Sequence, residues 1–435
     1  MKSRTQRPSI GIVGTGIAGM GCAHFLHGKY DVTLYERNDY VGGHTNTVAV
    51  NEEGTEIPID TGFMVYNEVT YPNLVRLFRE LHVETKPTSM SFSVQHIPSG
   101  LEFSGSSLNH LFAQRRNLLS PRFIRMLMRI DRFNTECLEV LDNDKFRSYT
   151  LQDYIDEKGF GGDMLMKYLV PMSSAVWSTP PDQMLKFPAV TLVRFFKNHG
   201  FLGLSTQHQW RTVVNGTRAY REKLIAPFRK KIRIGNPVVK VVRKPGTVEV
   251  RLKDGSKFLH DKVIVACHAD EALQLLDKPT AAERRLLGEF KYQHNTATLH
   301  TDASIMPKRK LAWSSWNYRL DVDRQGKALP STIYHMNSLQ QVSEKRDYFV
   351  SIDDPGLINR NSILKTIDYT HPVFSLGAIS AQGALPSLNT HGPVYFCGSY
   401  FKYGFHEDAF TSALDLCRTL TGNDIWSAKT EEQTV

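Results

Sequence analysis

The chain has 435 residues, of which 41% are hydrophobic and 22% are charged. A chain of this length and composition can bury a large core, and its length predicts two lobes. Its five cysteines are scattered without Cys-x-x-Cys spacing, which argues against a disulfide framework or a cysteine metal site. Apolar runs stay short of the roughly 18 residues that a membrane-spanning helix needs. We therefore expect a soluble cytoplasmic protein without a bound metal.

The net charge of +9 is unevenly distributed along the chain. Residues 108–132 contain a single acid, Asp131, and arginines interleaved with apolar residues. These arginines are Arg115, Arg116, Arg122, Arg125, Arg129 and Arg132. A basic amphipathic helix of this kind is typical of peripheral contact with an anionic membrane, which would be the inner face of the membrane. An ordinary surface helix with a solvated arginine face is the alternative. Without a recognised binding motif, the charge does not indicate a nucleic-acid partner.

The first predicted elements are a strand, a tight turn and a helix at residues 10–23, and a second strand that ends on Glu36. Gly14 permits the turn, Gly16 lets the backbone approach a pyrophosphate, and Gly19 lets the helix pack closely on the strand. The helix N-terminus offers free N–H groups to phosphates. Glu36 is placed to accept hydrogen bonds from a ribose hydroxyl. The pattern predicts a dinucleotide site without saying which dinucleotide binds.

The later elements return to this nucleotide-binding layer. A mainly helical pattern extends from Tyr71 to about Leu224, and period-two strands begin at Val238. Lys262–Ala266 is predicted to form a buried parallel strand, and a last buried strand at Val394–Gly398 precedes a helix at 409–420.

This split arrangement favours FAD over NAD, because a long cofactor can reach from the first unit to the last. We predict an α/β fold with a discontinuous Rossmann-type FAD-binding domain and a mixed α+β substrate domain. The FAD-binding domain comprises residues 1–70, 220–290 and 390–422, and the substrate domain comprises 71–219 and 291–389. Residues 423–435 are predicted to be a frayed tail. The final helix would aim its N-terminus at the flavin and stabilise negative charge there, although it could simply close the Rossmann layer.

Longer motifs carry a family resemblance. Glu36-Arg37-(x)4-Gly42-Gly43-His44-Thr45, together with Phe396–Tyr400 and Gly404–Asp408, resembles the FAD-dependent amine-oxidase-type oxidoreductases. More narrowly, the chain is similar to the branch found beside cyclopropane-fatty-acyl-phospholipid synthases. In plants, members of that branch are fused to such synthases as an N-terminal domain. Further matching stretches lie at 171–180, 313–318, 334–340 and 371–374, so the resemblance covers roughly residues 8–420. It implies an amine oxidase-like flavoprotein of lipid metabolism, with such a synthase as a candidate partner.

Two positions depart from the wider superfamily. His44 stands where relatives generally carry an arginine toward the pyrophosphate, and Gly398-Ser399 stands where many relatives place an acid. No cysteine lies in a motif for covalent flavin attachment, so we expect non-covalent FAD. The predicted cofactor-binding residues are Gly14, Gly16, Ile17, Ala18, Gly19, Glu36, Arg37, Gly42, Gly43, His44, Thr61, Gly62, Phe63, Val239, Gly398, Ser399, Glu407, Asp408 and Ala409.

Aromatic residues in the second half of the chain could form a substrate wall, although aromatic clusters are also ordinary core. The predicted wall consists of Trp313, Trp316, Tyr318, Tyr334, Tyr400 and Tyr403. His406 is the candidate catalytic residue, for proton transfer beside a flavin that accepts hydride. The alternative at this position is an acidic helix cap made by Glu407 and Asp408.

The resemblance to lipid-associated flavoproteins implies hydride removal from a fatty-acyl or phospholipid acyl chain, in a desaturase-type reaction. Two alternatives stay open. One is an amine oxidase that produces hydrogen peroxide, and the other is a flavoprotein scaffold or regulator of a lipid-modifying synthase.

Overall fold

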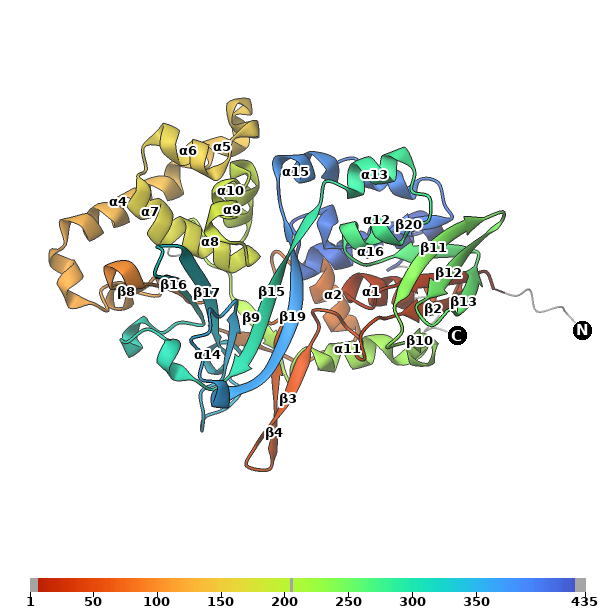
Figure 1. Cartoon of the computed structure of the whole chain (residues 1–435), viewed down its shortest axis with the longest axis horizontal. Helices are drawn as coiled ribbons and strands as arrows, with labels where there is room; N and C mark the ends of the chain where they lie inside the picture. Colours follow the sequence, from red (N-terminus) through yellow and green to blue (C-terminus); the bar gives the residue numbers. More distant parts are fainter. Residues whose placement is uncertain (1–6, 204–205, 427–435) are drawn as a thin grey trace, which may run out of the picture.

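The computed structural model describes residues 7–203 and 206–426. Two lobes meet along the long strands β15 (Lys291–His300) and β19 (Ile363–Val373), which pair antiparallel (Figure 1). We call them the Rossmann lobe, built on a five-stranded sheet, and the cap lobe, built on a seven-stranded sheet. The α/β fold with a discontinuous Rossmann lobe is as predicted. None of the described helices is long and apolar enough to cross a membrane.

The Rossmann sheet has strand order β10-β2-β1-β14-β20, with every pair parallel. In that order the strands span Ile232–Arg233, Asp31–Tyr35, Ser9–Val13, Lys262–Val265 and Val394–Phe396. Both faces of the sheet are covered, which explains the continuous apolar runs. Ile12 and Ile264 face a core shared with α1 (Ile17–Leu26) and α16 (His406–Thr421). Val263 and Val265 face the other core, beneath β12 (Thr247–Leu252) and α12 (Ala269–Leu275).

Smaller elements complete the Rossmann lobe. The predicted period-two strands form an antiparallel sheet of β11 (Val238–Lys244), β12 (Thr247–Leu252) and β13 (Lys257–His260). The remaining helices on this side are α11 (Arg218–Ile225), α12 (Ala269–Leu275), α13 (Ala281–Leu287) and α15 (Leu376–Gln382).

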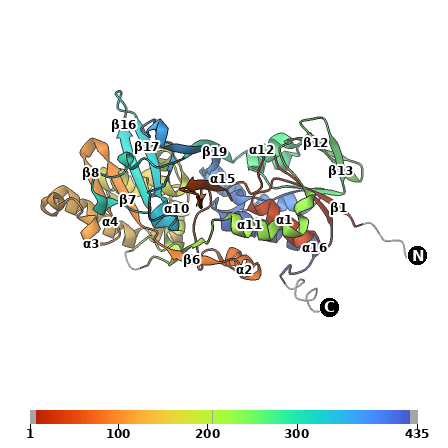
Figure 2. The same cartoon turned by 90° about the horizontal axis from the view of Figure 1, so that it is seen from below.

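The cap lobe has strand order β19-β15-β18-β17-β16-β7-β8. Its other strands are β7 (Phe92–His96), β8 (Leu101–Ser104), β16 (Trp316–Val322), β17 (Ala328–His335) and β18 (Phe349–Ile352). Helices inserted between β8 and β9 (Trp210–Val213) gather at one side of this sheet (Figures 1 and 2). They are α3 (Leu108–Leu111), α4 (Pro121–Glu136), α5 (Glu139–Asp142), α6 (Leu151–Lys158), α7 (Gly162–Met164), α8 (Val170–Trp177), α9 (Pro181–Leu185) and α10 (Ala189–Asn198). The short helix α14 (Met336–Gln340) follows β17.

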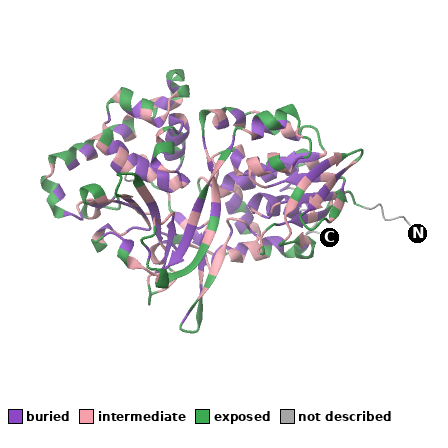
Figure 3. Cartoon of the chain, viewed as in Figure 1, coloured by how far each residue is buried: buried purple, intermediate pink, exposed green. Residues whose placement is uncertain are grey.

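Short pieces connect the two lobes. The hairpin of β3 (Thr47–Glu52) and β4 (Thr55–Asp60) projects away from the body, and its tip is exposed (Figure 3). A small sheet joins β5 (Tyr66–Asn67), β9 (Trp210–Val213) and β6 (Thr85–Thr88). Helix α2 (Pro72–Glu80) lies nearby.

Three predictions about the chain need correction. The predicted domain boundary at Tyr71 assigns α2 to the substrate side, whereas α2 packs against α16 of the Rossmann lobe. The basic segment 108–132 is broken into α3, a 3-10 turn at Arg115–Leu119 and α4, because Pro121 restarts the helix behind its cap, Ser120.

The predicted frayed tail also begins too early. Trp426 is buried, and its ring packs edge-on against Phe25 at 4.9 Å between centroids. Burial of this large aromatic side chain holds the segment around Trp426 against α1. Residues 427–435 of the predicted tail lie outside the described residues.

Candidate functional site

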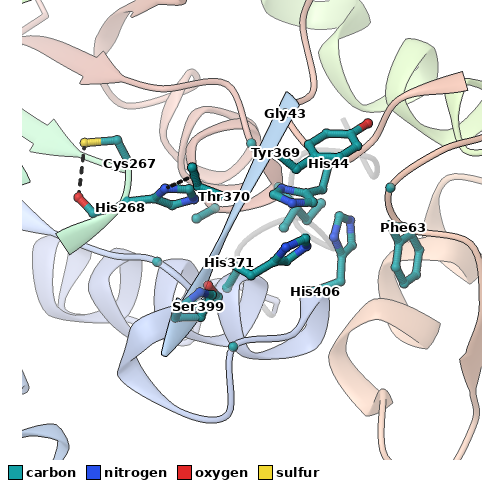
Figure 4. A pocket seen from close by; sticks show the side chains of 18 of the residues that line it. Gly43, His44, Phe63, Cys267, His268, Tyr369, Thr370, His371, Ser399 and His406 are labelled. Atoms are coloured by element: carbon teal, nitrogen blue, oxygen red, sulfur yellow. Dashed lines mark hydrogen bonds between the residues drawn. The ribbon is translucent and has the colours of Figure 1, made fainter. Parts of the chain in front are cut away.

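A cavity of about 1020 Å³ extends between the two lobes. One end lies at the turn between β1 and α1 and at the end of β2. From there the cavity passes the N-terminus of α16 and ends among aromatic side chains of the cap lobe. Figure 4 shows the middle of this cavity, where side chains from β19, α16 and the Gly43 loop approach one another.

The three fingerprint glycines serve two different purposes. A Cβ on Gly14 would lie 2.6 Å from the Ala266 carbonyl oxygen, and one on Gly19 would lie 2.0 Å from the Gly14 carbonyl oxygen. These two glycines therefore permit close backbone packing. A Cβ on Gly16 would meet no atom of the described residues within 4 Å, and Gly16 lines the cavity. This open cradle at a helix N-terminus fits a pyrophosphate.

Glu36 holds the end of β2 against the fingerprint turn. One carboxylate oxygen accepts hydrogen bonds from the backbone N–H of Thr15 (3.1 Å) and from its hydroxyl (2.5 Å), and the other accepts from Asn38 N–H (3.0 Å). A carboxylate offers about four acceptor sites. Glu36 therefore has the capacity to accept one further bond, as a ribose contact requires, while it stabilises the turn itself.

The opposite end of the nucleotide path is the N-terminus of α16. Asp408 accepts a hydrogen bond from Phe405 N–H (2.9 Å) and thereby caps its own helix. Burial raises the pKa of Asp408 to about 7. Glu407 instead caps α2, where it accepts from the N–H groups of Asn73 and Leu74, both at 2.9 Å. Both carboxylates thus support the fold, and Ala409 lines the cavity at the positive end of the helix dipole.

Histidines line the middle of the cavity (Figure 4). His44 stacks on Tyr369, with ring centroids 4.6 Å apart, and its ring lies 5.2 Å from that of His371. Its Nε2 is buried without a hydrogen-bond partner among the described residues. An unpartnered buried nitrogen is costly unless another group meets it, so His44 fits a cavity that takes a polar ligand.

His406 is held flat and uncharged at this place. Its ring stacks on Phe63 at 3.9 Å between centroids, and its Nε2 lies 2.6 Å from the Tyr220 hydroxyl. That hydroxyl lies 2.5 Å from Thr45 Oγ1, so the three groups form a continuous hydrogen-bonded chain. Burial lowers the pKa of His406 to about 3, so the imidazole is neutral at pH 7. The catalytic role of His406 stays a prediction, and a neutral ring can accept a proton but cannot donate one as imidazolium.

The cap-lobe end of the cavity is walled by apolar groups. Trp316 and Tyr334, both predicted, face each other edge-on from β16 and β17, with centroids 5.0 Å apart. Sequence analysis missed most of the wall, which also includes Tyr71, Met90, Val176, Trp177, Phe195, Phe201, Trp210, Ile367 and Phe405. These come from separate helices, strands and loops; Val176, Trp177 and Phe405 stood in quoted family stretches but were not predicted as wall residues.

The structure separates the predicted site residues into two groups. Those that line the cavity are Gly14, Gly16, Ile17, Ala18, Glu36, Arg37, Gly43, His44, Gly62, Phe63, Val239, Gly398, Ser399, Ala409, His406, Trp316, Tyr334 and Tyr400. Outside its lining are Gly19, Gly42, Thr61, Glu407, Asp408, Trp313, Tyr318 and Tyr403. The glycines outside serve close packing, and Thr61 donates to or accepts from the Tyr369 hydroxyl at 3.0 Å.

The three aromatic residues outside the lining are corrections to the predicted wall. Trp313 packs with Phe349 in a separate cluster and lies beneath the Lys310 ammonium. Tyr318 is two residues farther along β16 than Trp316, where Ala175 of α8 covers it. Tyr403 lies behind the wall, and its backbone carbonyl accepts a hydrogen bond from Trp177 Nε1 at 3.3 Å.

Charged groups gather at one end of the cavity. Glu36, Arg37 and Glu271 lie beside the fingerprint, where Arg37 and Glu271 form an ion pair at 2.5 Å. Among the described lining residues nearer the cap lobe, the one carboxylate is Asp368, which is exposed on β19. The cavity is thus polar where a nucleotide would bind and apolar beyond it.

Solved structures with the same fold include cyclohexylamine oxidase from Brevibacterium oxydans, at 15% identity with a TM-score of 0.68, covering 95% of this chain and 99% of that one. A fatty acid isomerase from P. acnes that produces CLA has 14% identity and a TM-score of 0.68, covering 96% of this chain and 100% of that one.

One similar curated protein is the 15-cis-phytoene desaturase of Synechococcus elongatus. It is 33% identical over 78 residues, which are 18% of this chain and 16% of that protein. The family described as flavin-containing amine oxidoreductase matches residues 17–328. This match spans most of the chain and agrees with the shared fold, so the protein belongs to the flavin-containing amine oxidoreductase family and is an FAD-dependent oxidoreductase.

Proposed function

We propose that the protein binds FAD without a covalent bond and removes a hydride from a fatty-acyl chain, free or within a phospholipid. The observation that carries this proposal is the apolar cap-lobe end of the cavity. A cationic amine held there would have aromatic faces beside it, but among the described lining residues at that end no buried carboxylate to neutralise its charge. Among the described lining residues on that side, the one carboxylate is the exposed Asp368, whereas a hydrocarbon chain would meet aromatic and aliphatic side chains along most of the wall.

The residues of the chain suit FAD along the whole cavity. Gly16 and the N-terminus of α1 would hold the pyrophosphate, Glu36 the ribose, and the N-terminus of α16 the flavin. Bound FAD would supply the hydride-accepting chemistry. The neutral His44 would offer its unpartnered nitrogen where relatives generally place an arginine.

The cysteine in the cavity lining supports non-covalent binding. Cys267 lies beside Glu271 at the nucleotide end, away from the α16 N-terminus. Burial raises the pKa of its thiol, with the Glu271 charge adding to the effect, so the sulfur stays protonated and weakly nucleophilic.

The cap-lobe wall would orient the chain and exclude water. Trp316, Tyr334 and Phe405 are held by packing on different elements, so a bound chain would meet a preformed surface. The same wall would keep water away from the reacting part of the acyl chain. The fatty acid isomerase and the phytoene desaturase among the similar proteins are consistent with an apolar substrate, and the resemblance to flavoproteins beside cyclopropane-lipid synthases supports it as well.

Anaerobic mixing of the flavin-loaded protein with candidate substrates tests this function. We expect phospholipids with unsaturated or cyclopropanated acyl chains to bleach the flavin absorbance, and we expect cyclohexylamine and putrescine to leave it unchanged. Bleaching by an amine, with peroxide on readmission of oxygen, would establish the amine oxidase alternative. A flavin that no candidate reduces, in a protein that co-purifies with a lipid synthase, would favour the scaffold.

A matched pair of variants tests whether the substrate binds in the cavity. Met90 is partly exposed on the wall, so Met90→Glu should slow acyl-dependent flavin reduction at least about tenfold, because it buries a charge beside hydrocarbon. Met90→Leu should react almost as the parent does. Equal rates for both variants would mean that the substrate does not contact this wall.

A further inference from the structure

Exposed apolar side chains cluster on one part of the cap lobe. Leu119 is 89% exposed, Leu108 70% and Met128 68%, and Leu118 and Ile124 are also exposed. All five lie within α3, the Arg115–Leu119 turn and the first half of α4. Together with Arg116 and Arg125 we call them the arginine–leucine patch. Single exposed apolar residues are ordinary, whereas larger apolar patches are typical of interaction surfaces, so five within 21 residues of chain make this segment a candidate surface.

The patch stands on a packed base. Phe123 is buried and contacts Phe103 and Phe112, with ring centroids 5.7 and 5.8 Å apart. Ser120 accepts a hydrogen bond from Phe123 N–H and thereby starts α4. Because these contacts fix the inner side of the segment, Leu118 and Leu119 are held toward solvent by the fold.

Basic residues accompany the apolar ones on α4. Ile124 and Met128 are four residues apart and share a face, and Arg125 lies three residues before Met128. Arg125 makes no ion pair among the described residues, and Arg116 bonds only the Gly100 carbonyl oxygen, at 3.2 Å. The nearby Asp163 is already neutralised by Arg122 and Lys167. The patch thus carries unneutralised positive charge.

We propose that the arginine–leucine patch docks the protein peripherally on an anionic phospholipid surface, with the leucines below the headgroups and Arg116 and Arg125 among the phosphates. Apolar insertion and attraction to anionic lipid strengthen each other on such surfaces. Arginines and apolar side chains also occur together in protein interfaces, so the dependence on anionic lipid separates the two kinds of partner. The proposal stands independently of the acyl reaction, although docking would bring an acyl chain close to the enzyme.

Co-sedimentation of the flavin-loaded protein with vesicles tests the docking. Binding should be stronger to phosphatidylcholine vesicles containing phosphatidylglycerol than to phosphatidylcholine alone, and added salt should weaken it. L118S/L119S should lower the partition coefficient at least about tenfold on both kinds of vesicle, since two leucines lose insertion. R116E/R125E should abolish the preference for phosphatidylglycerol.

Matched controls lie on other surfaces. L259S/V322S removes two exposed apolar groups elsewhere, and K253E/K257E makes the same change of net charge on another part of the chain. Both should bind vesicles as the parent does. The proposal is overturned if the parent does not bind, or if patch and control variants bind alike. It is also overturned if the patch variants change only the elution volume in size exclusion, which would make the patch a protein interface. Flavin reduction by detergent-dispersed lipid should be the same in all four variants, which separates this test from that of the acyl reaction.

Discussion

Gly16→Val and Gly19→Ala should both lose FAD, the first because its cofactor site is obstructed and the second because its fold is damaged. At Gly16 the backbone is extended (φ −61°, ψ 175°), which valine adopts readily, and a Cβ would meet no described atom within 4 Å. Folding stability should therefore fall by no more than about 1 kcal/mol, the cost of replacing the glycine N-cap of α1 by valine. The added side chain enters the cavity where a pyrophosphate would approach the backbone. Overpacking of about 1–3 kcal/mol there weakens FAD binding roughly 5–150-fold.

At Gly19 the added methyl would lie 2.0 Å from the Gly14 carbonyl oxygen, far inside van der Waals contact. The obstruction is backbone, so α1 must move away from β1, and the cost should be at least about 1–3 kcal/mol of folding stability. Flavin loss in this variant would follow from the damaged fold.

Two measurements separate the two failures. Urea unfolding of each flavin-depleted protein gives the stability, and titration with FAD gives the affinity by fluorescence quenching. We expect Gly16→Val to unfold like the depleted parent and to bind FAD weakly, and Gly19→Ala to unfold at lower urea. If Gly16→Val bound FAD with the parent's affinity, the cavity at Gly16 would not be the pyrophosphate site.

Two further predictions concern stability. Glu407→Ala should cost about 1–2 kcal/mol in urea unfolding because α2 loses its cap at Asn73 and Leu74, and Glu407→Gln should cost less because one acceptor oxygen remains. Acid should also destabilise the protein. Burial lowers the pKa of His199 and of His371 to about 4. Between pH 6.5 and 4 the unfolded chain therefore binds protons at these histidines that the native state does not bind. Each histidine contributes a fall of about 1.4 kcal/mol per pH unit across that window, and Asp408, whose pKa is raised to about 7, offsets one of them. His199→Asn should make the slope of unfolding free energy against pH shallower by one proton, and an unchanged slope would contradict the burial argument.

Local sequence patterns predicted the elements whose geometry depends on residues close together in the chain. The fingerprint turn, the parallel strand at Lys262–Val265 and the helix that follows Gly398 were all predictable, because strand alternation and glycine turns depend on neighbours in sequence. The close packing at Gly14 agrees with the tight turn that the spacing predicted, whereas the pyrophosphate role of Gly16 stays a prediction. The contrast between a packed Gly19 and an open Gly16 became measurable only from the surrounding backbone.

The sequence by itself determined the nucleotide end of the protein, since Gly14, Gly16 and Glu36 lie within one strand–turn–helix–strand unit. Only the tertiary structure decided the cap-lobe end of the cavity. Its wall combines Trp177, Phe195, Trp316 and Phe405 from four separate segments, whose meeting depends on how the two lobes pack. It also showed that Glu407 caps a helix more than 300 residues earlier in the chain, a contact that no local pattern encodes. Side chains brought together by long-range packing leave no periodic trace in sequence, so aromatic residues of core and cavity look the same until the chain has folded.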